Sequence, residues 1–225
     1  MVVLATKVYV DGEARERALD GLETLVADAI ADLDVEFTLG LRDDGFPSVT
    51  VTGADATAAR NLLAAEWGAV TPHREPGETH VGTLESWDDE GFVLDAGEDV
   101  RVPADGLGLG QGTPAQIRTR FGLVQHLPLR FHEPAEADDP RRLADTERDR
   151  LYEWTRGTDR LNVNSATRAE VRATVNRAGH ADDVVTVERL GLLEQSVVCR
   201  EGTDAPGLLA EVGPHLRSEL LAVVP

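Results

Sequence analysis

The chain has 225 residues, of which 41% are apolar, and a formal net charge of −19 at pH 7. This composition excludes a disordered acidic tail, and no apolar run approaches the roughly 18 residues that a membrane-spanning helix needs. Lys7 is the only lysine, against 21 arginines and 41 acidic residues. This bias predicts a halophilic protein, adapted to a cytoplasm at molar salt, where strongly hydrated carboxylates keep proteins soluble.

The single cysteine and the N-terminal segment predict a reducing compartment. Cys199 has no second cysteine with which to form an internal disulfide. It lies in a predicted apolar strand, where packing is a commoner role than nucleophilic chemistry. Asp11 interrupts the N-terminal segment before the apolar core of a signal peptide could form. We therefore expect a cytoplasmic protein with no membrane partner.

Residues 1–72 are predicted to form a βαββα module. β-Branched residues favour a strand at the N-terminus, and apolar residues then recur at helical spacing. Alternating apolar residues on both sides of Asp44–Gly45 predict a hairpin. The predicted elements are a strand at 2–10, a helix at 14–32, strands at 35–41 and 49–51, and a helix from Asp55 to Gly68.

Residues 77–132 are predicted to form a small β-barrel, because short apolar runs alternate with turns every eight to ten residues. The segment Gly106–Gly112 is rich in glycine but lacks the third glycine of a dinucleotide-binding fingerprint. No Gly-Lys-Ser/Thr signature of a phosphate loop follows it. We therefore expect this segment to be a turn-rich connector. An acidic stretch, Glu133–Asp139, separates the barrel from the last third of the chain.

Residues 140–225 are predicted to form a helix followed by a ferredoxin-like βαββαβ module. Asp139–Pro140 combines a capping residue with a proline, so a helix is expected from there to Trp154. Thr167 and Glu170 predict a capping box. The later elements are strands at 161–164, 184–187, 193–199 and 220–224, with helices at 167–179 and 204–216. The predicted fold class is therefore α+β, in three parts.

Three segments resemble an archaeal family that is known as domain of unknown function 2110. They are Arg120–Leu129 (RFGLVQHLPL), Asp159–Ser165 (DRLNVNS) and Glu201–Gly207 (EGTDAPG). The similarity covers nearly the whole chain and identifies a haloarchaeal member of this family. The resemblance implies a gene that lies near that of a basal transcription factor of the initiation machinery. It assigns no activity and carries over no catalytic residue.

Two windows of the chain interrupt its acidic composition. Residues 101–132 contain four arginines against one acidic residue, Asp105, and residues 160–180 contain four arginines against Glu170. One explanation is burial at a domain interface, because interface positions face no solvent and need no acidic residue. The other is binding of an anion, such as a nucleic-acid backbone or an acidic protein. The sequence leaves both explanations open.

The first functional hypothesis is a non-enzymatic adaptor that binds nucleic acid or nucleoprotein in transcription or translation. Its partners are RNA, DNA or a transcription or translation complex. The hypothesis requires both windows to be exposed on one side of the molecule. The arginines expected to make the contacts are Arg118, Arg120, Arg130, Arg160 and Arg168.

The alternative hypothesis is an enzyme or small-molecule-binding protein with a pocket between the barrel and the C-terminal module. His126, Asn162 and Asn164 are expected to line that pocket. The six histidines show no pair at metal-ligand spacing, and the sequence has no Gly-x-Ser-x-Gly elbow. We therefore assign no catalytic residue, metal or cofactor, and we favour a protein that is not an enzyme.

Overall fold

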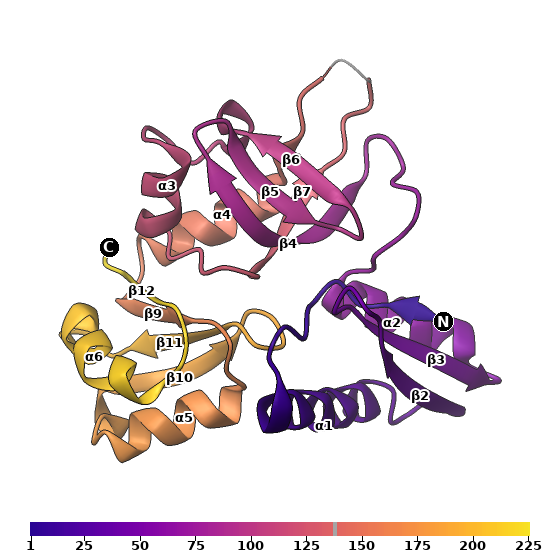
Figure 1. Ribbon diagram of the computed structural model, residues 1–225, viewed down its shortest axis with the longest axis horizontal. Helices are drawn as coiled ribbons and strands as arrows, with labels where there is room; N and C mark the ends of the chain where they lie inside the picture. Colours follow the sequence, from indigo (N-terminus) through magenta and orange to yellow (C-terminus); the bar gives the residue numbers. More distant parts are fainter. Residues whose placement is uncertain (137–138) are drawn as a thin grey trace.

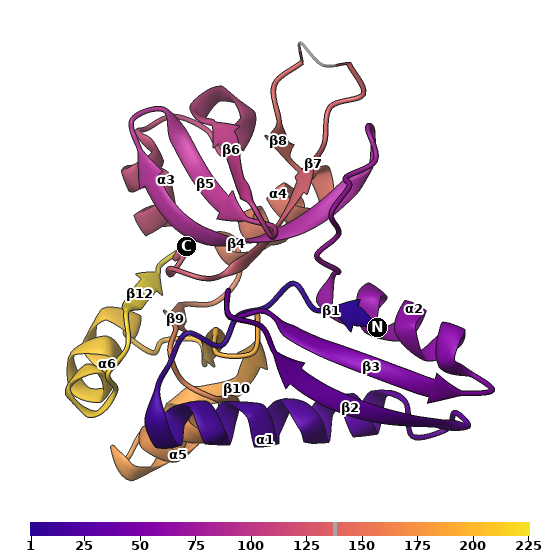
Figure 2. The ribbon, with the colours of Figure 1, turned by 45° about the vertical axis from the view of Figure 1, so that its right-hand side comes forward.

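The computed structural model describes residues 1–136 and 139–225 and contains three β-sheets, each with its own helices (Figure 1). The predicted α+β class is therefore confirmed. The sheets form three lobes that follow one another along the chain, and the central lobe lies above the other two in Figures 1 and 2. The described residues also form three short 3₁₀ helices, η1–η3, at Ala104–Leu107, Ala181–Asp183 and Gly213–His215.

The N-terminal part has a three-stranded antiparallel sheet in the order β1-β3-β2. Its elements are β1 (Val2–Val3), α1 (Gly12–Ala29), β2 (Val35–Leu41), β3 (Pro47–Gly53) and α2 (Ala56–Trp67). The order of elements is the predicted one, but the first strand is much shorter than predicted. Residues 4–11 instead run between the lobes, because Thr6, Lys7 and Tyr9 bond to the central and C-terminal parts.

The central part has a five-stranded sheet in the order β6-β5-β4-β7-β8, which curls into a half-barrel. Its strands are β4 (Thr79–Asp88), β5 (Gly91–Asp95), β6 (Asp99–Pro103), β7 (Pro128–His132) and β8 (Arg142–Leu143). The small β-barrel predicted for this part is therefore present only as a half-barrel, because β6 and β8 do not pair and remain the two edges of the sheet. The helix α3 (Pro114–Arg120) was not predicted, although Thr113 and Gln116 form its capping box.

The helix α4 (Asp145–Trp154) begins later than predicted, because Arg142 and Leu143 pair with β7 as strand β8. The side chains of Leu151 and Trp154 belong to the apolar core of the central sheet. The sequence instead predicts this helix as part of the C-terminal module. The acidic stretch at 133–139 falls partly on residues 137–138, which lie outside the described residues.

The C-terminal part has a four-stranded antiparallel sheet in the order β10-β11-β9-β12. Its elements are β9 (Arg160–Val163), α5 (Arg168–Arg177), β10 (Val184–Arg189), β11 (Gln195–Cys199), α6 (Ala205–Val212) and β12 (Leu220–Val223). The predicted capping box of Thr167 and Glu170 is confirmed. All residues of β11 are buried, including Cys199 as predicted.

The three parts of the chain share their cores. Leu192 and Leu193, in the loop between β10 and β11, pack in the core of the N-terminal part. The backbone N–H of Leu192 donates to Thr6 Oγ1 at 3.0 Å, and Val223 of β12 lies in the central core. This arrangement places a buried junction at the centre of the molecule. None of the described helices combines the length and the apolar character needed to cross a membrane.

Candidate functional site

A cavity of about 240 Å³ lies where the three parts of the chain meet. Three arginines line it, from β7, α4 and the end of β10, and we call it the arginine cavity. Its residues are Ala5, Thr6, Glu66, Trp67, Val81, Pro128, Arg130, Arg150, Arg189, Leu190 and Gly191.

One buried carboxylate holds two of these arginines. Glu147 of α4 is completely buried, and its Oε2 accepts hydrogen bonds from the backbone N–H of Arg130 at 3.2 Å and from Arg130 Nη1 at 3.4 Å. Its other oxygen, Oε1, accepts from Arg150 Nη2. A buried charge is tolerated only when it is paired and hydrogen-bonded. Glu147 therefore fixes the two guanidinium groups relative to each other.

The third arginine comes from the C-terminal part and is held by the N-terminal part. Arg189 Nη2 lies 3.3 Å from Glu66 Oε1, and its guanidinium lies over the ring of Trp67 at 4.9 Å from the centroid. Stacking on an indole face orients the guanidinium group without using its N–H donors.

The arginine cavity therefore carries a positive charge in excess. Glu147 and Glu66 are the two acidic partners of three guanidinium groups, each of which has five N–H donors. The side chains of Arg130, Arg150 and Arg189 retain 43%, 27% and 31% of their exposure. In a chain of net charge −19, this arrangement is chemically suited to an anion.

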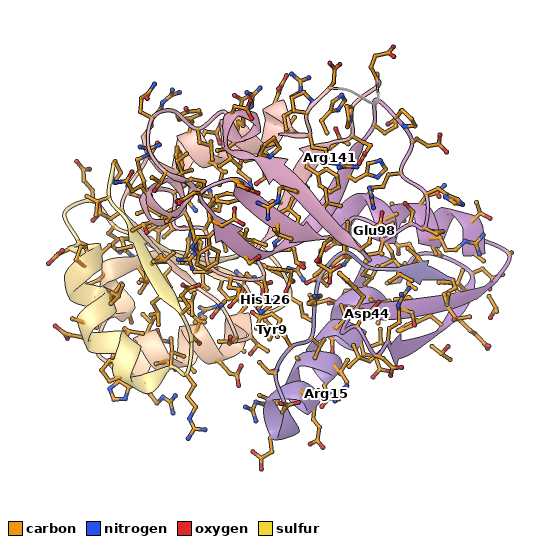
Figure 3. The ribbon with its side chains drawn as sticks, turned by 45° about the horizontal axis from the view of Figure 1, so that its top comes forward. Tyr9, Arg15, Asp44, Glu98, His126 and Arg141 are labelled. Atoms are coloured by element: carbon orange, nitrogen blue, oxygen red, sulfur yellow. The ribbon has the colours of Figure 1, made fainter. Side chains whose placement is uncertain are left out.

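A second polar group of residues lies beside the cavity, centred on Tyr9. The Tyr9 hydroxyl donates to Glu194 Oε1 at 2.5 Å and accepts from the backbone N–H of Ser165 at 2.9 Å. Its ring lies against the ring of His126, tilted by 33° and with centroids 3.8 Å apart. The two residues are labelled near the centre of the molecule in Figure 3. One tyrosine therefore connects all three parts of the chain.

The only lysine of the chain belongs to the same group. Lys7 Nζ lies 3.0 Å from Glu85 Oε1 and 2.6 Å from Asp95 Oδ2. His126 Nδ1 lies 3.2 Å from the same oxygen of Glu85. Burial raises the pKa of Glu85, but hydrogen bonds with His126, Lys7 and Thr83 outweigh it and lower the pKa to about 2. We call Lys7, Tyr9, Glu85, His126, Ser165 and Glu194 the junction cluster.

Glu194 is the completely buried acid of the junction cluster. Burial raises its pKa to about 8, although the hydrogen bond from Tyr9 opposes this shift. Its Oε2 has no hydrogen-bond partner among the described residues, and a Cβ atom added at Gly191 would clash with it. Glu194 therefore lies directly behind the part of the cavity wall that Gly191 and Pro128 form.

Backbone strain is concentrated in the junction cluster. Among the described residues, His126 (φ 67°) and Ser165 (φ 58°) are the only ones other than glycine with positive φ. Such a conformation is sparsely populated for these residues, and it persists only where the surroundings impose it. The contacts of Tyr9 with both residues supply that constraint.

The arginines predicted in the window 101–132 have different surroundings. Arg118 is buried, stacks on Trp87 at 3.7 Å from the ring centroid, and pairs with Glu219. Arg120 is exposed, but its guanidinium donates to the carbonyls of Leu109 at 2.5 Å and Gln111 at 2.8 Å, which anchors the glycine-rich segment. Arg130 alone of the eight predicted binding residues lines the arginine cavity.

The predicted residues of the C-terminal part also bond within the chain. Arg160 Nη1 pairs with Glu188 Oε2 at 2.5 Å, and Arg168 Nε donates to the carbonyl of Val187 at 2.6 Å. Asn162 Nδ2 donates to Gly122 O at 2.9 Å, and Asn164 Nδ2 donates to Gln125 O at 3.1 Å. Both asparagines are buried and connect the C-terminal sheet to the central part, and neither they nor His126 line the arginine cavity.

The sequence does not predict Arg150, Arg189 and Glu147 as residues of the site, because the elements that bring them together are distant in the chain. It also does not predict the roles of Tyr9 and Glu194. One sequence feature that points to the junction cluster is Lys7, because it is the only lysine in the chain. Within residues 1–136 and 139–225, no group of His, Cys, Asp or Glu side chains is arranged to hold a metal ion.

Family comparisons cover almost the whole chain. The N-terminal, central and C-terminal domains of DUF2110 match residues 1–73, 74–155 and 158–224, respectively. No curated protein and no solved structure matches the chain. The arginine cavity and the junction cluster draw residues from all three matched domains. The chain belongs to the DUF2110 family.

Proposed function

We propose that this protein is a non-enzymatic binding protein whose ligand carries a phosphate or carboxylate group held in the arginine cavity. The observation that carries this proposal is the convergence of Arg130, Arg150 and Arg189 on one cavity. A guanidinium group offers paired N–H donors that match the oxygens of phosphate and carboxylate.

The fixed positions of the guanidinium groups support binding, because less conformational entropy is lost when a ligand arrives. Glu147 holds Arg130 and Arg150 from behind, and Trp67 supports Arg189 from one face. We also propose that the acidic composition adapts the chain to molar salt. Screening acts over about 3 Å at 1 M salt, so only short, direct hydrogen bonds of this kind would retain an anion there.

The size of the cavity limits the ligand. A volume of about 240 Å³ corresponds to roughly eight water molecules, which suits a phosphate, a sulfate or a small organic acid. Val81, Pro128 and Leu190 form an apolar part of the cavity wall beside the arginines. The cavity can therefore also hold a short apolar group attached to the anion.

Calorimetric titration with inorganic phosphate tests the proposal. We expect Arg189→Ala to weaken phosphate binding by about ten- to hundredfold, because hydrogen bonds to charged groups contribute about 1.5–3 kcal/mol. Glu66→Gln removes the carboxylate that competes for Arg189, and we expect it to strengthen binding by up to about tenfold.

The matched control is Arg15→Ala, which makes the same charge change on an exposed part of α1 (Figure 3). It is expected to leave the affinity unchanged. Absence of phosphate binding to the wild-type protein, both at low salt and in about 2 M KCl, would rule out the arginine cavity as an anion site. An equal loss in Arg15→Ala and Arg189→Ala would show that only net charge matters.

A second candidate is the nucleic-acid- or nucleoprotein-binding adaptor of transcription or translation that the sequence suggests. The observation that favours it is that Arg130 of the first arginine window lines the cavity, where a nucleic-acid phosphate is an equivalent ligand. A 5′-phosphorylated RNA oligonucleotide distinguishes the two sources of phosphate. Tight RNA binding that needs both Arg189 and the terminal phosphate would assign the site to nucleic acid. Binding of free phosphate alone would assign it to a small anion.

A further inference from the structure

A groove of about 280 Å³ runs between helix α5 and strand β10, which lie side by side in Figure 1. Its apolar floor includes Val175 and Val187, both buried. Its cationic residues are Arg168 and Arg172, and none of the described acidic residues lines it. Such a lining is unusual for a chain in which acidic residues outnumber basic ones by nearly two to one.

The two arginines lack acidic partners. Among the described residues, neither Arg168 nor Arg172 makes a salt bridge, whereas Arg160 of the same window pairs with Glu188. They lie four residues apart on α5 and are both exposed. Like charges at this spacing destabilise a helix. An acidic ligand would relieve this repulsion.

The strand beside them is also incompletely covered. β10 is one of the two edge strands of its sheet, and its pairing with β11 shifts register between Val184 and Thr186. This irregularity turns Val185 outward, where it retains 62% of its exposure. An exposed valine on a sheet edge, next to two arginines, is an apolar contact point with adjacent positive charge.

We propose that this groove binds an acidic segment of a partner protein. Two carboxylates of the segment contact Arg168 and Arg172, and an aliphatic side chain between them packs on Val185. Charge complementarity selects an acidic ligand. The apolar floor and the absence of an aromatic residue from the lining favour a peptide over nucleic acid, because single-stranded nucleic acid is held largely by stacking on aromatic rings.

Fluorescence anisotropy with a labelled eight-residue peptide of alternating aspartate and leucine tests this proposal. We expect Arg172→Glu to weaken peptide binding by at least about tenfold, since reversing one contact charge costs more than removing a single charged hydrogen bond. Val185→Asp is expected to have a similar effect through the apolar contact. Arg172 and Val185 are exposed, so both variants are expected to fold.

Arg177→Glu is the control, because it makes the same charge reversal on α5 but does not line this groove. It is expected to bind like the wild-type protein. A peptide with asparagine in place of aspartate is expected not to bind. The proposal is overturned if the acidic peptide does not bind, if Arg177→Glu matches Arg172→Glu, or if RNA of similar length binds through Arg172 and the peptide does not. Phosphate binding in the arginine cavity is a separate measurement and does not affect this outcome.

Discussion

Replacing Glu147 by alanine is expected to destabilise the protein by about 2–3 kcal/mol. The carboxylate is completely buried and serves Arg130 and Arg150 together. Its removal leaves two guanidinium groups close to each other without their common partner. The penalty arises from the lost hydrogen bonds to the carboxylate, and it stays below that of a fully buried pair because Arg130 and Arg150 are partly exposed and can be solvated. Urea-induced unfolding of the variant and the wild-type protein measures this difference.

Glu153→Ala is the matched control, since Glu153 lies on the same helix and is exposed. Surface substitutions of this kind change stability by less than about 0.5 kcal/mol. The same pair of variants also tests the arrangement of the site. If Glu147→Ala costs less than about 1 kcal/mol, Glu147 is not the residue that organises the two arginines, and the fixed geometry of the arginine cavity loses its support.

Helices that carry their own signals were predictable from the sequence. Helices α1 and α2 show apolar residues at helical spacing, and Gly68 ends α2 where predicted. The capping box of Thr167 and Glu170 located the start of α5. These signals are local, because they depend on residues within a few positions of one another.

Elements that depend on distant contacts were not predictable in the same way. Strand β8 has only two residues, and it forms because these residues pair with the edge of β7. Helix α3 has seven residues, too few for a periodic apolar pattern, and only its capping box marks it. Strand β1 ends early because the side chains of Thr6, Lys7 and Tyr9 bond to the central and C-terminal parts. Tertiary contacts therefore override local propensity at these places.

The two arginine windows show that charge patterning predicts only some of the residues of a binding site. Burial and internal pairing account for Arg118 and Arg160, which contact Glu219 and Glu188. Arg130 and Arg168 belong to the same two windows. Arg130 lines the arginine cavity, and Arg168 lines the groove between α5 and β10. Composition alone could not separate the two groups, because their partners are carboxylates and carbonyls contributed by other elements.

The stability of the protein is expected to fall as the pH rises from about 4.5 to about 8, and Glu194→Gln is expected to remove most of this fall. Burial raises the pKa of Glu194 from 4.5 to about 8. Above pH 4.5 the unfolded chain releases this proton while the folded protein keeps it, so stability decreases with rising pH until Glu194 ionises in both states. Protonated Glu194 makes its full contribution to the free energy of unfolding below pH 4.5. Relative to its value above pH 8, this contribution amounts to at most about 5 kcal/mol. At pH 9 the glutamine variant is therefore expected to be more stable than the wild-type protein.

Unfolding curves between pH 5 and 9.5 test this expectation, with Glu201→Gln as an exposed control of the same chemistry. Hydrogen bonds with Asp183 and Glu211 raise the pKa of His180, so His180 also contributes a small loss of stability as the pH rises. Glu194→Gln and Glu201→Gln both keep His180, so this loss is the same in the two variants. Glu85, with its pKa lowered to about 2, affects stability only in acid, where its contribution is lost as the pH falls from 4.5 through 2. If the loss of stability between pH 5 and 8 is as large in Glu194→Gln as in the wild-type protein, Glu194 does not carry the proton, and the junction cluster contains an ionised buried carboxylate instead.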